Sequence, residues 1–219
     1  MNNLVIFGGS FDPPHWGHIN TALAVQQYFH FQHFIFLPCK TPVLKPANIA
    51  TPTQRLMMLK LALTEYSEFE VDAREINRPT PSYMVHTLES YRAEWGENTA
   101  ITLLLGMDAF IQLPQWYQWD RLLGLAHLLI LNRNPAPTAE FSSPLNHLLL
   151  ICKTHDKDDL LKQPHGKILC YDAGYYPISS TQLRNKVHAG ESIESYAPQS
   201  VIQYIKDQAL YQQDCCRDP

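Results

Sequence analysis

The feature that most constrains the fold is an apolar run near the start of the chain that ends abruptly in two glycines. Residues 4–7 form a continuous apolar stretch, which is typical of a strand covered on both faces. Gly8 and Gly9 follow it, and residues 17–30 then carry apolar side chains near helical spacing. A strand, a glycine turn and a helix in this order predict the first unit of a parallel α/β sheet.

The same alternation continues along the rest of the chain. We expect further strands at residues 33–37, 69–72, 100–105, 127–131 and 167–171, and residues 148–152 are compatible with one more. Helices are expected at residues 53–66 (with Leu56, Met57, Leu59 and Leu63 buried), 82–95 (capped by Ser82 and ended by Gly96), 179–189 and from about Pro198.

This order predicts one domain spanning residues 1–219, with the C-terminal helices of residues 179–210 packed on it. The expected fold is α/β, a Rossmann-like, doubly wound, mostly parallel sheet with helices on both faces. Ligands of such sheets bind at the carboxyl ends of the strands.

Composition narrows the class of protein. The chain has 219 residues, 45% of them hydrophobic and 17% charged, as globular domains do. Its net charge of −4 argues against a broad nucleic-acid surface, and no apolar run approaches the roughly 20 residues that span a bilayer. The five cysteines form no CxxC pair. We therefore expect a cytoplasmic protein without nucleic-acid or membrane partners.

The segment GGSFDPPHWGH, residues 8–18, is the first that carries chemistry. A helix is expected to begin just past its histidines, so that N–H groups and the positive end of the helix dipole face one spot. His15 and His18 stand three residues apart and can face the same ligand, and Gly17 leaves room for a planar base or phosphates. HxGH alone is compatible with an ordinary tight turn, but the whole string directly after a strand predicts an anion site.

The second segment is ISSTQLR, residues 178–184. Ser179, Ser180 and Thr181 present hydroxyl and N–H groups at a helix start, and Arg184 adds a fixed fork of donors. Ser179 and Gln182 also match a capping box. Taken alone, the segment is explained by this helix cap without any ligand. Paired with the first segment, it predicts a second contact to phosphates.

The two segments resemble the HxGH and ISSTxxR signatures of the nucleotidyltransferase superfamily. In that superfamily the first signature binds a triphosphate, and the second, with its arginine, holds the β- and γ-phosphates. The resemblance implies that His15, His18 and Arg184 are catalytic. It implies ATP contacts from Gly8, Gly9, Ser10, Phe11, His15, His18, Lys45, Gly106, Asp108, Ile178, Ser179, Ser180, Thr181 and Arg184.

Nearly the whole chain resembles the family of bacterial nicotinate-nucleotide adenylyltransferases. The resemblance rests on DAREINR at residues 72–78, PSYMVHTL at 81–88, GMD at 106–108 and LPQWYQW at 113–119. In the family, GxD meets the adenosine or ribose, PSYT lines the nicotinate pocket, and the tryptophan of a Trp-Tyr pair stacks on the pyridine. The resemblance implies nicotinate-nucleotide contacts from Tyr83, Met84, Val85, Trp116, Tyr117 and Arg133.

The chain departs from the family pattern at several of these positions. Leu44 stands where the family has the histidine of PPHK or PPHR, although Lys45 keeps the positive charge. Met84 replaces the threonine of PSYT, and of the basic-Pro-Gly turn only Arg133 is kept. Solvated loop charge is the simpler explanation for Lys40, whereas a phosphate contact is favoured for Lys45.

The reaction implied is transfer of AMP from ATP to nicotinate mononucleotide, giving nicotinate adenine dinucleotide and pyrophosphate. The attacking phosphate has a second pKa of about 6, so no general base is required. Mg²⁺ is expected to bridge substrate phosphates, with water and phosphate oxygens as its ligands and no metal site built from protein side chains.

Other functions remain open from the residues alone. These are a preference for the amide mononucleotide, another adenylyl or cytidylyl transfer, and a non-catalytic nucleotide sensor, against which the intact HxGH and Arg184 argue. A metal site of Asp12, His15 and His18 lacks a further histidine or cysteine. Asp12 is expected instead to cap its own turn before Pro13.

Overall fold

The sheet at the centre of the molecule is fully parallel. The computed structural model describes residues 1–41, 49–131 and 141–212. Its strands are β1 (Asn3–Gly9), β2 (His33–Pro38), β3 (Phe69–Val71), β4 (Ala100–Gly106), β5 (His127–Leu131) and β6 (Ile168–Tyr171). They pair in the order β3-β2-β1-β4-β5-β6, every neighbouring pair parallel. This confirms the doubly wound α/β fold.

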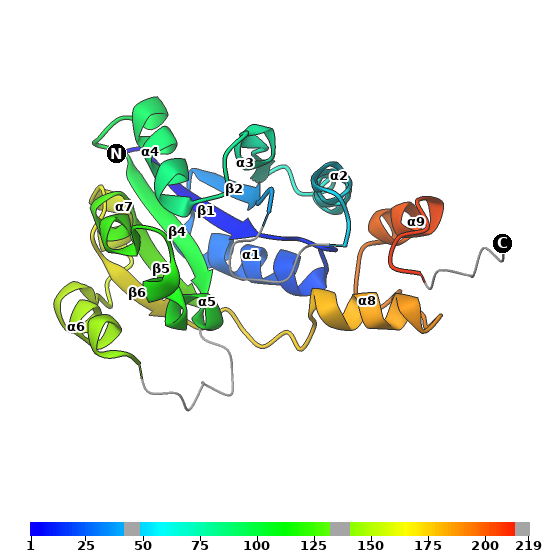
Figure 1. Ribbon diagram of the computed structural model, residues 1–219. Coiled ribbons are helices and arrows are strands. Elements are labelled where there is room, and N and C mark those ends of the chain that lie inside the picture. The colour runs from blue at the N-terminus through cyan, green and yellow to red at the C-terminus, as the bar shows by residue number, and fades with distance from the viewer. Residues whose placement is uncertain (42–48, 132–140, 213–219) are drawn as a thin grey trace.

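Helices connect the strands and cover the sheet (Figure 1). They are α1 (Trp16–Phe29), α2 (Pro52–Ala62), α3 (Arg74–Asn77), α4 (Met84–Trp95), α5 (Met107–Ile111), α6 (Ser143–Cys152), α7 (Asp158–Lys162), α8 (Ser180–His188) and α9 (Gln199–Asp207). Two short 3-10 helices, Leu113–Gln115 and Trp119–Gly124, follow α5. Within the described residues, no helix has the length and apolar character needed to cross a bilayer.

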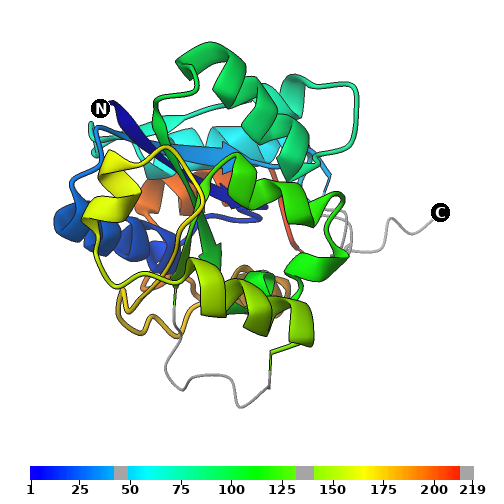
Figure 2. The same cartoon turned by 90° about the vertical axis from the view of Figure 1, so that its left-hand side faces the viewer.

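Two hydrophobic cores lie on opposite faces of the sheet, because successive strand side chains point to opposite sides. Val5 of β1 joins the core formed with α1, α2, α8 and α9. Its neighbours Leu4 and Ile6 join the core formed with α4, α5 and α6. Figure 2 shows helices on both sides of the sheet. Burial on both faces explains why the strands are apolar without alternation.

The point where the strand order reverses lies between β1 and β4. The chain leaves β1 through α1 to β2 on one side, and later returns to β4 on the other side. Leu4 pairs with Ile101 and Ile6 with Leu103, so the two strands run side by side and end at Gly9 and Gly106. The segments that follow these two ends face the crevice in which doubly wound sheets bind ligands.

The expected strand at residues 148–152 is wrong, because these residues form the second half of helix α6. Leu145 is fully buried, and Leu148, Leu149 and Cys152 pack against the same core at helical spacing. Leu150, between them, is 84% exposed. The apolar run is therefore one face of a helix that begins before residue 148.

Two details of the expected helices are also wrong. Helix α4 begins at Met84 rather than at Ser82, whose hydroxyl accepts a hydrogen bond from the Lys40 N–H at 3.0 Å. On α2 the side chain of Met57 is 45% exposed, and the buried methionine is Met58. The end of α4 at Gly96 is confirmed, and φ is +83° there.

The C-terminal helices follow their expected boundaries and pack on the rest of the molecule. Ser179 caps α8 through a capping box with Gln182. Val201, Ile202 and Ile205 of α9 are buried, and α9 lies against α2. In Figure 1, α8 and α9 stand at the opposite end of the molecule from α6.

His127, the first residue of β5, is a fully buried histidine that stays neutral. Its Nδ1 accepts a hydrogen bond from the Lys167 N–H at 3.1 Å, and its Nε2 donates to the Gln163 carbonyl at 2.8 Å. Burial lowers the pKa of His127 to about 4. The unfolded chain therefore binds a proton at moderately acid pH that the folded chain excludes.

We predict that His127 makes the fold acid-sensitive. Its contribution is complete above pH ~6.5 and is lost as the pH falls towards ~4, roughly 3 kcal/mol in all. Urea unfolding at neutral and acid pH should show a smaller pH dependence for His127→Asn than for the wild-type protein. The exposed-residue control His155→Asn should keep the wild-type dependence. Equal pH dependence in all three proteins would contradict the prediction.

Candidate active site

The two histidines of the first segment form a stacked pair where α1 begins. His15 is the N-cap of α1, and its ring lies 3.7 Å from that of His18, centroid to centroid, at an angle of 26°. The ring of Phe11 lies 5.0 Å from that of His18, centroid to centroid, at an angle of 67°. The backbone N–H of His15 donates to Nδ1 of His18 at 3.3 Å, which places the proton of the neutral ring on Nε2. The orientation and the tautomer of His18 are thus both determined by its neighbours.

Gly17 makes room for the protein itself rather than for a ligand. A Cβ at this position would lie 3.0 Å from Cε1 and Nδ1 of His15, and 3.6 Å from Cβ of Ile178. The space that the sequence analysis left for a base or phosphates is filled by the His15 ring. Gly17 therefore permits the stacked histidine pair.

The other glycines of the segment also make close internal contacts. The ring of Phe11, a residue with φ of +50°, folds back so that a Cβ at Gly9 would lie 2.9 Å from its Cζ. A Cβ at Gly8 would lie 3.4 Å from Cε of Met84. This second contact brings the segment at residues 81–88 beside the first signature.

Asp12 does not cap its own turn, and that expectation is wrong. Its carboxylate accepts the N–H groups of Ile49 (2.9 Å) and Ala50 (3.2 Å) and the hydroxyl of Tyr211 (2.6 Å). Only 2% of Asp12 is exposed. The side chain joins the turn to two distant segments, because each of them supplies donors that a buried carboxylate needs.

The second signature lies against the first. Arg184 donates to the Asp12 carbonyl at 2.7 Å and to the Thr181 hydroxyl at 3.1 Å. The Ser180 hydroxyl donates to the Pro13 carbonyl at 2.9 Å, while the Ser179 hydroxyl accepts the Gln182 N–H as the helix cap. The starts of α1 and α8 are therefore adjacent, and the Ser180 hydroxyl and the Arg184 guanidinium hold them together.

Arg55 of α2 is a site residue that the sequence analysis missed. It is fully buried, and its guanidinium donates to the carbonyls of Ser10 (2.6 Å), Cys39 (2.6 Å) and Lys40 (2.8 Å). It thus joins the segments that follow β1 and β2. Arg55 stands three and four residues before the buried Met58 and Leu59, so it lies on the apolar face of the helix. A charged residue on that face is the signal from which a buried arginine could have been predicted.

Gly106 and Asp108 lie at the carboxyl end of β4, next to β1. Gly106 ends the strand, and no described atom lies within 4 Å of the position that its Cβ would take. Asp108 is exposed in the first turn of α5. The predicted adenosine contacts therefore lie at the same edge of the sheet as the histidines, and the space beside Gly106 is open.

Two of the predicted acceptor residues, Tyr83 and Tyr117, meet at the start of α4. Tyr83 precedes the helix, and its ring lies 4.6 Å from that of Tyr117, with His86 5.6 Å from Tyr117. Tyr117 is 47% exposed, whereas Trp116 is partly buried against the core on that face. Val85 is fully buried, so that only its backbone can face a ligand.

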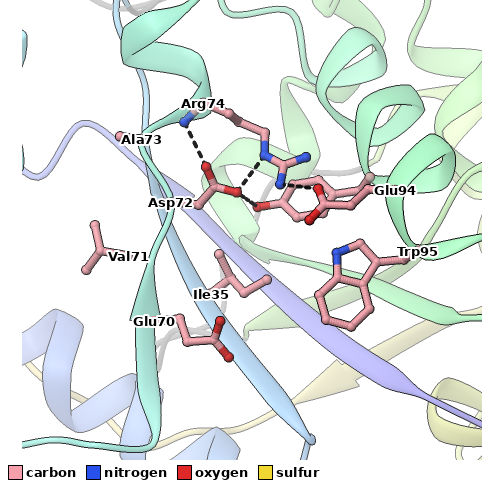
Figure 3. A pocket seen from close by; sticks show the side chains of 9 residues that line it. Ile35, Glu70, Val71, Asp72, Ala73, Arg74, Glu94 and Trp95 are labelled. Atoms are coloured by element: carbon pink, nitrogen blue, oxygen red, sulfur yellow. Dashed lines mark hydrogen bonds and ion pairs between the residues drawn. The ribbon is translucent and has the colours of Figure 1, made fainter.

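Asp72 and Arg74, in the segment of residues 72–78 that follows β3, are joined to α4 by hydrogen bonds (Figure 3). Asp72 accepts hydrogen bonds from Arg74 and from the Tyr91 hydroxyl (2.8 Å), and Arg74 also reaches Glu94 at 2.8 Å. Burial raises the pKa of Tyr91, so that the phenol remains a donor. These side chains border a cavity of about 240 Å³.

A second buried network fixes the same segment. The Thr87 hydroxyl donates to Glu75 at 2.6 Å and accepts from Arg78 at 3.0 Å, and burial raises the pKa of Glu75. Lys40 Nζ donates to the Arg78 carbonyl at 2.8 Å. Lys40 therefore connects the end of β2 to this segment rather than standing as a solvated loop charge.

Some predicted residues lie outside the described part of the chain, namely Leu44, Lys45 and Arg133. Among the described residues, no three His, Cys, Asp or Glu side chains come together as metal ligands. The carboxylate of Asp12 is directed to Ile49, Ala50 and Tyr211.

Comparison with known proteins agrees with this geometry. The model of the cytidylyltransferase-like family matches residues 6–186. A protein of Legionella pneumophila (strain Paris), named "Probable nicotinate-nucleotide adenylyltransferase", is 45% identical over 212 residues, covering 97% of this chain and 100% of the relative. A protein of the same name from Methylococcus capsulatus (strain ATCC 33009 / NCIMB 11132 / Bath) is 38% identical, covering 94% of this chain and 98% of the relative.

The fold is also that of a solved structure. The nicotinic acid mononucleotide adenylyltransferase of Plasmodium falciparum, in complex with NaAD, superposes with a TM-score of 0.71. The two chains are 19% identical, and the match covers 96% of this chain and 98% of the other.

Arg55 generates a prediction about stability. Replacing it by methionine leaves three carbonyls without their donor, so Arg55→Met should lower the free energy of unfolding by roughly 3 kcal/mol. Lys60→Met changes an exposed residue on the same helix and should alter stability by less than about 0.5 kcal/mol. Urea unfolding of both variants tests this, and equal stabilities would show that the carbonyl contacts contribute nothing.

Proposed function

Since the chain belongs to the cytidylyltransferase-like family, among its nicotinate-nucleotide adenylyltransferases, we propose that it transfers AMP from ATP to nicotinate mononucleotide. The products are nicotinate adenine dinucleotide and pyrophosphate. The observation that carries the proposal is the meeting of the two signatures, in which Arg184 reaches the Asp12 carbonyl at 2.7 Å. This contact supports a site formed by His15, His18 and Arg184 at the starts of α1 and α8.

In the proposed reaction, a phosphate oxygen of the mononucleotide attacks the α-phosphorus of ATP. The bond from that phosphorus to the bridging oxygen breaks, and its electron pair leaves with pyrophosphate. The attacking phosphate is already largely ionised at neutral pH, so no side chain has to remove a proton. The chain contributes positioning and fixed donors for the developing charge. His18, whose ring is held with its proton on Nε2, is suited to donate to a phosphate oxygen.

We place the triphosphate of ATP over the first segment and the start of α8. Its donors there would be backbone groups at Gly8, Gly9, Ser10 and Phe11, the side chains of His15, His18 and Arg184, and the helix start at Ile178, Ser179, Ser180 and Thr181. Gly106 and Asp108 would meet the adenosine, and Lys45 would add a charge to the phosphates.

The nicotinate ring would lie beside Tyr117 and Trp116, at the start of α4. Tyr117 is 47% exposed, whereas Trp116 is only partly exposed. The backbone N–H groups of Met84 and Val85 would bind the carboxylate, beside Tyr83, whose own N–H donates to the Pro81 carbonyl. Arg133 would contact the mononucleotide. Met84 already contacts the first segment, which makes the acceptor and ATP sites neighbours.

Mg²⁺ fits this site as an ion that enters with ATP. The described side chains at the two signatures are mainly cationic or neutral donors, which suit phosphate oxygens rather than a metal. Phosphate oxygens and water would then complete its coordination, and the ion would neutralise charge on the phosphates. The cytoplasmic location and the absence of a nucleic-acid partner stay predictions.

The test of the function is pyrophosphate release by purified protein with ATP and Mg²⁺. We predict release with nicotinate mononucleotide, and slower release with the amide mononucleotide, because the donors at the start of α4 favour a carboxylate. Faster release with the amide would show that the acceptor is wrong. No release with either would leave a nucleotide sensor as the better proposal.

The role of His18 gives a second prediction. Removal of one donor that stabilises charge on the leaving group should lower kcat by roughly 10²-fold in His18→Ala. The exposed residue His155 provides the matched control, since His155→Ala should keep the wild-type rate. A folded His18→Ala protein with normal turnover would exclude the proposed role.

A further inference from the structure

Tyr211, near the C-terminal end of the described chain, is buried beside the first signature. It follows α9 with a left-handed φ of +62°, and only 6% of it is exposed. Its hydroxyl donates to Oδ1 of Asp12 at 2.6 Å and lies 4.0 Å from the Met58 sulfur. Burial, together with the negative charge of Asp12, raises the pKa of Tyr211. The phenol is therefore a permanent donor at physiological pH.

The carboxylate that Tyr211 holds is a junction of three segments. Its other donors are the N–H groups of Ile49 and Ala50, at the end of the loop that follows β2. A carboxylate that is 2% exposed depends on such donors, because it has lost its hydration. Removal of one donor would favour movement of Asp12 towards solvent and loosen all three segments.

The main chain of Asp12 lies within the proposed ATP site. Its carbonyl is bound by Arg184, and the next carbonyl, of Pro13, is bound by Ser180. Three residues beyond Asp12 stands the stacked His15. The N–H of Trp16, at the start of α1, donates to the carbonyl of Tyr196 at 2.9 Å. A shift of Asp12 therefore changes the alignment of both signatures.

We propose that Tyr211 is a positioning residue for the transfer reaction, which acts by holding Asp12 and with it the turn that receives the triphosphate. This inference rests on the proposed function. A positioning role differs from a role in packing alone, because loss of the Tyr211 hydroxyl would weaken ATP binding by allowing Asp12 to move. This effect should not reach the aromatic acceptor site at the start of α4.

The variant Tyr211→Phe tests the inference, since it removes the hydroxyl and keeps the buried ring. We expect kcat/KM for ATP to fall roughly tenfold, the size of effect that loss of one hydrogen bond to a charged group can have. The KM for nicotinate mononucleotide should change less than about twofold. Unchanged kcat/KM for ATP, or an equal rise of both KM values, would overturn the proposal. Urea unfolding confirms that the compared proteins are folded.

Two further variants show whether the effect passes through Asp12. Tyr204→Phe alters a tyrosine of α9 whose hydroxyl forms no hydrogen bond within the described residues, and it should behave as wild type. In a background of Asp12→Ala, which removes the oxygen that accepts the Tyr211 hydroxyl, adding Tyr211→Phe should cost less than about twofold. Fully additive losses would mean that Tyr211 acts elsewhere.

The inference can fail separately from the proposed function. If the wild-type protein releases no pyrophosphate, the function is wrong, and the affinity for ATP with Mg²⁺ becomes the measured quantity. Isothermal titration should then give a Kd for ATP roughly tenfold weaker in Tyr211→Phe than in wild type. Equal Kd values in the two proteins would overturn the positioning role, whatever reaction the protein catalyses.

Discussion

The candidate site depends on how the carbonyl groups of one turn are satisfied. A turn that directs its N–H groups to an anion must direct carbonyls the other way, into the protein. Here those of Ser10, Asp12 and Pro13 accept from Arg55, Arg184 and Ser180, respectively. Buried carbonyls without such donors would make the turn unstable. Two arginines and a serine from distant helices therefore hold the turn in the shape that it needs.

This arrangement gives Arg184 a second role. The superfamily resemblance assigns this arginine to the phosphates, whereas the structure shows its guanidinium bound to the Asp12 carbonyl and the Thr181 hydroxyl. Five N–H donors in a rigid fork allow an arginine to serve protein and ligand together. In the proposed reaction, the charge that would stabilise the leaving group is thus fixed in position before the substrate arrives.

Much of the fold could be predicted from the sequence, because strand and helix periods differ and glycines mark the turns. Residues 148–152 were predicted as a strand but form part of α6, because an apolar run of five residues fits the period of either element. The buried Leu145, three residues before the run, indicates the helix. The two signatures could be predicted to meet, because both are helix starts that suit one triphosphate. The groups that hold the two signatures together could not be predicted.

Contacts between side chains and distant carbonyls leave little trace in one sequence. Arg55 could have been suspected from its place on an apolar helix face, but its partners on two other loops could not be named. Nothing in the sequence indicates a role for Tyr211, because its partner Asp12 lies 199 residues earlier. The pattern correctly indicated that another group lies close to the backbone of Gly17. Only the structure showed that this group is the ring of His15.

The distance along the chain between these partners has a consequence for synthesis. During synthesis Asp12 leaves the ribosome well before its partners, because Arg184 follows it by 172 residues and Tyr211 by 199. The central strand can pair with its neighbours long before the turn beyond it acquires its supports. A growing chain can therefore bury most of its sheet while its histidines still lack their final alignment, so that the proposed triphosphate site is completed only after the sheet.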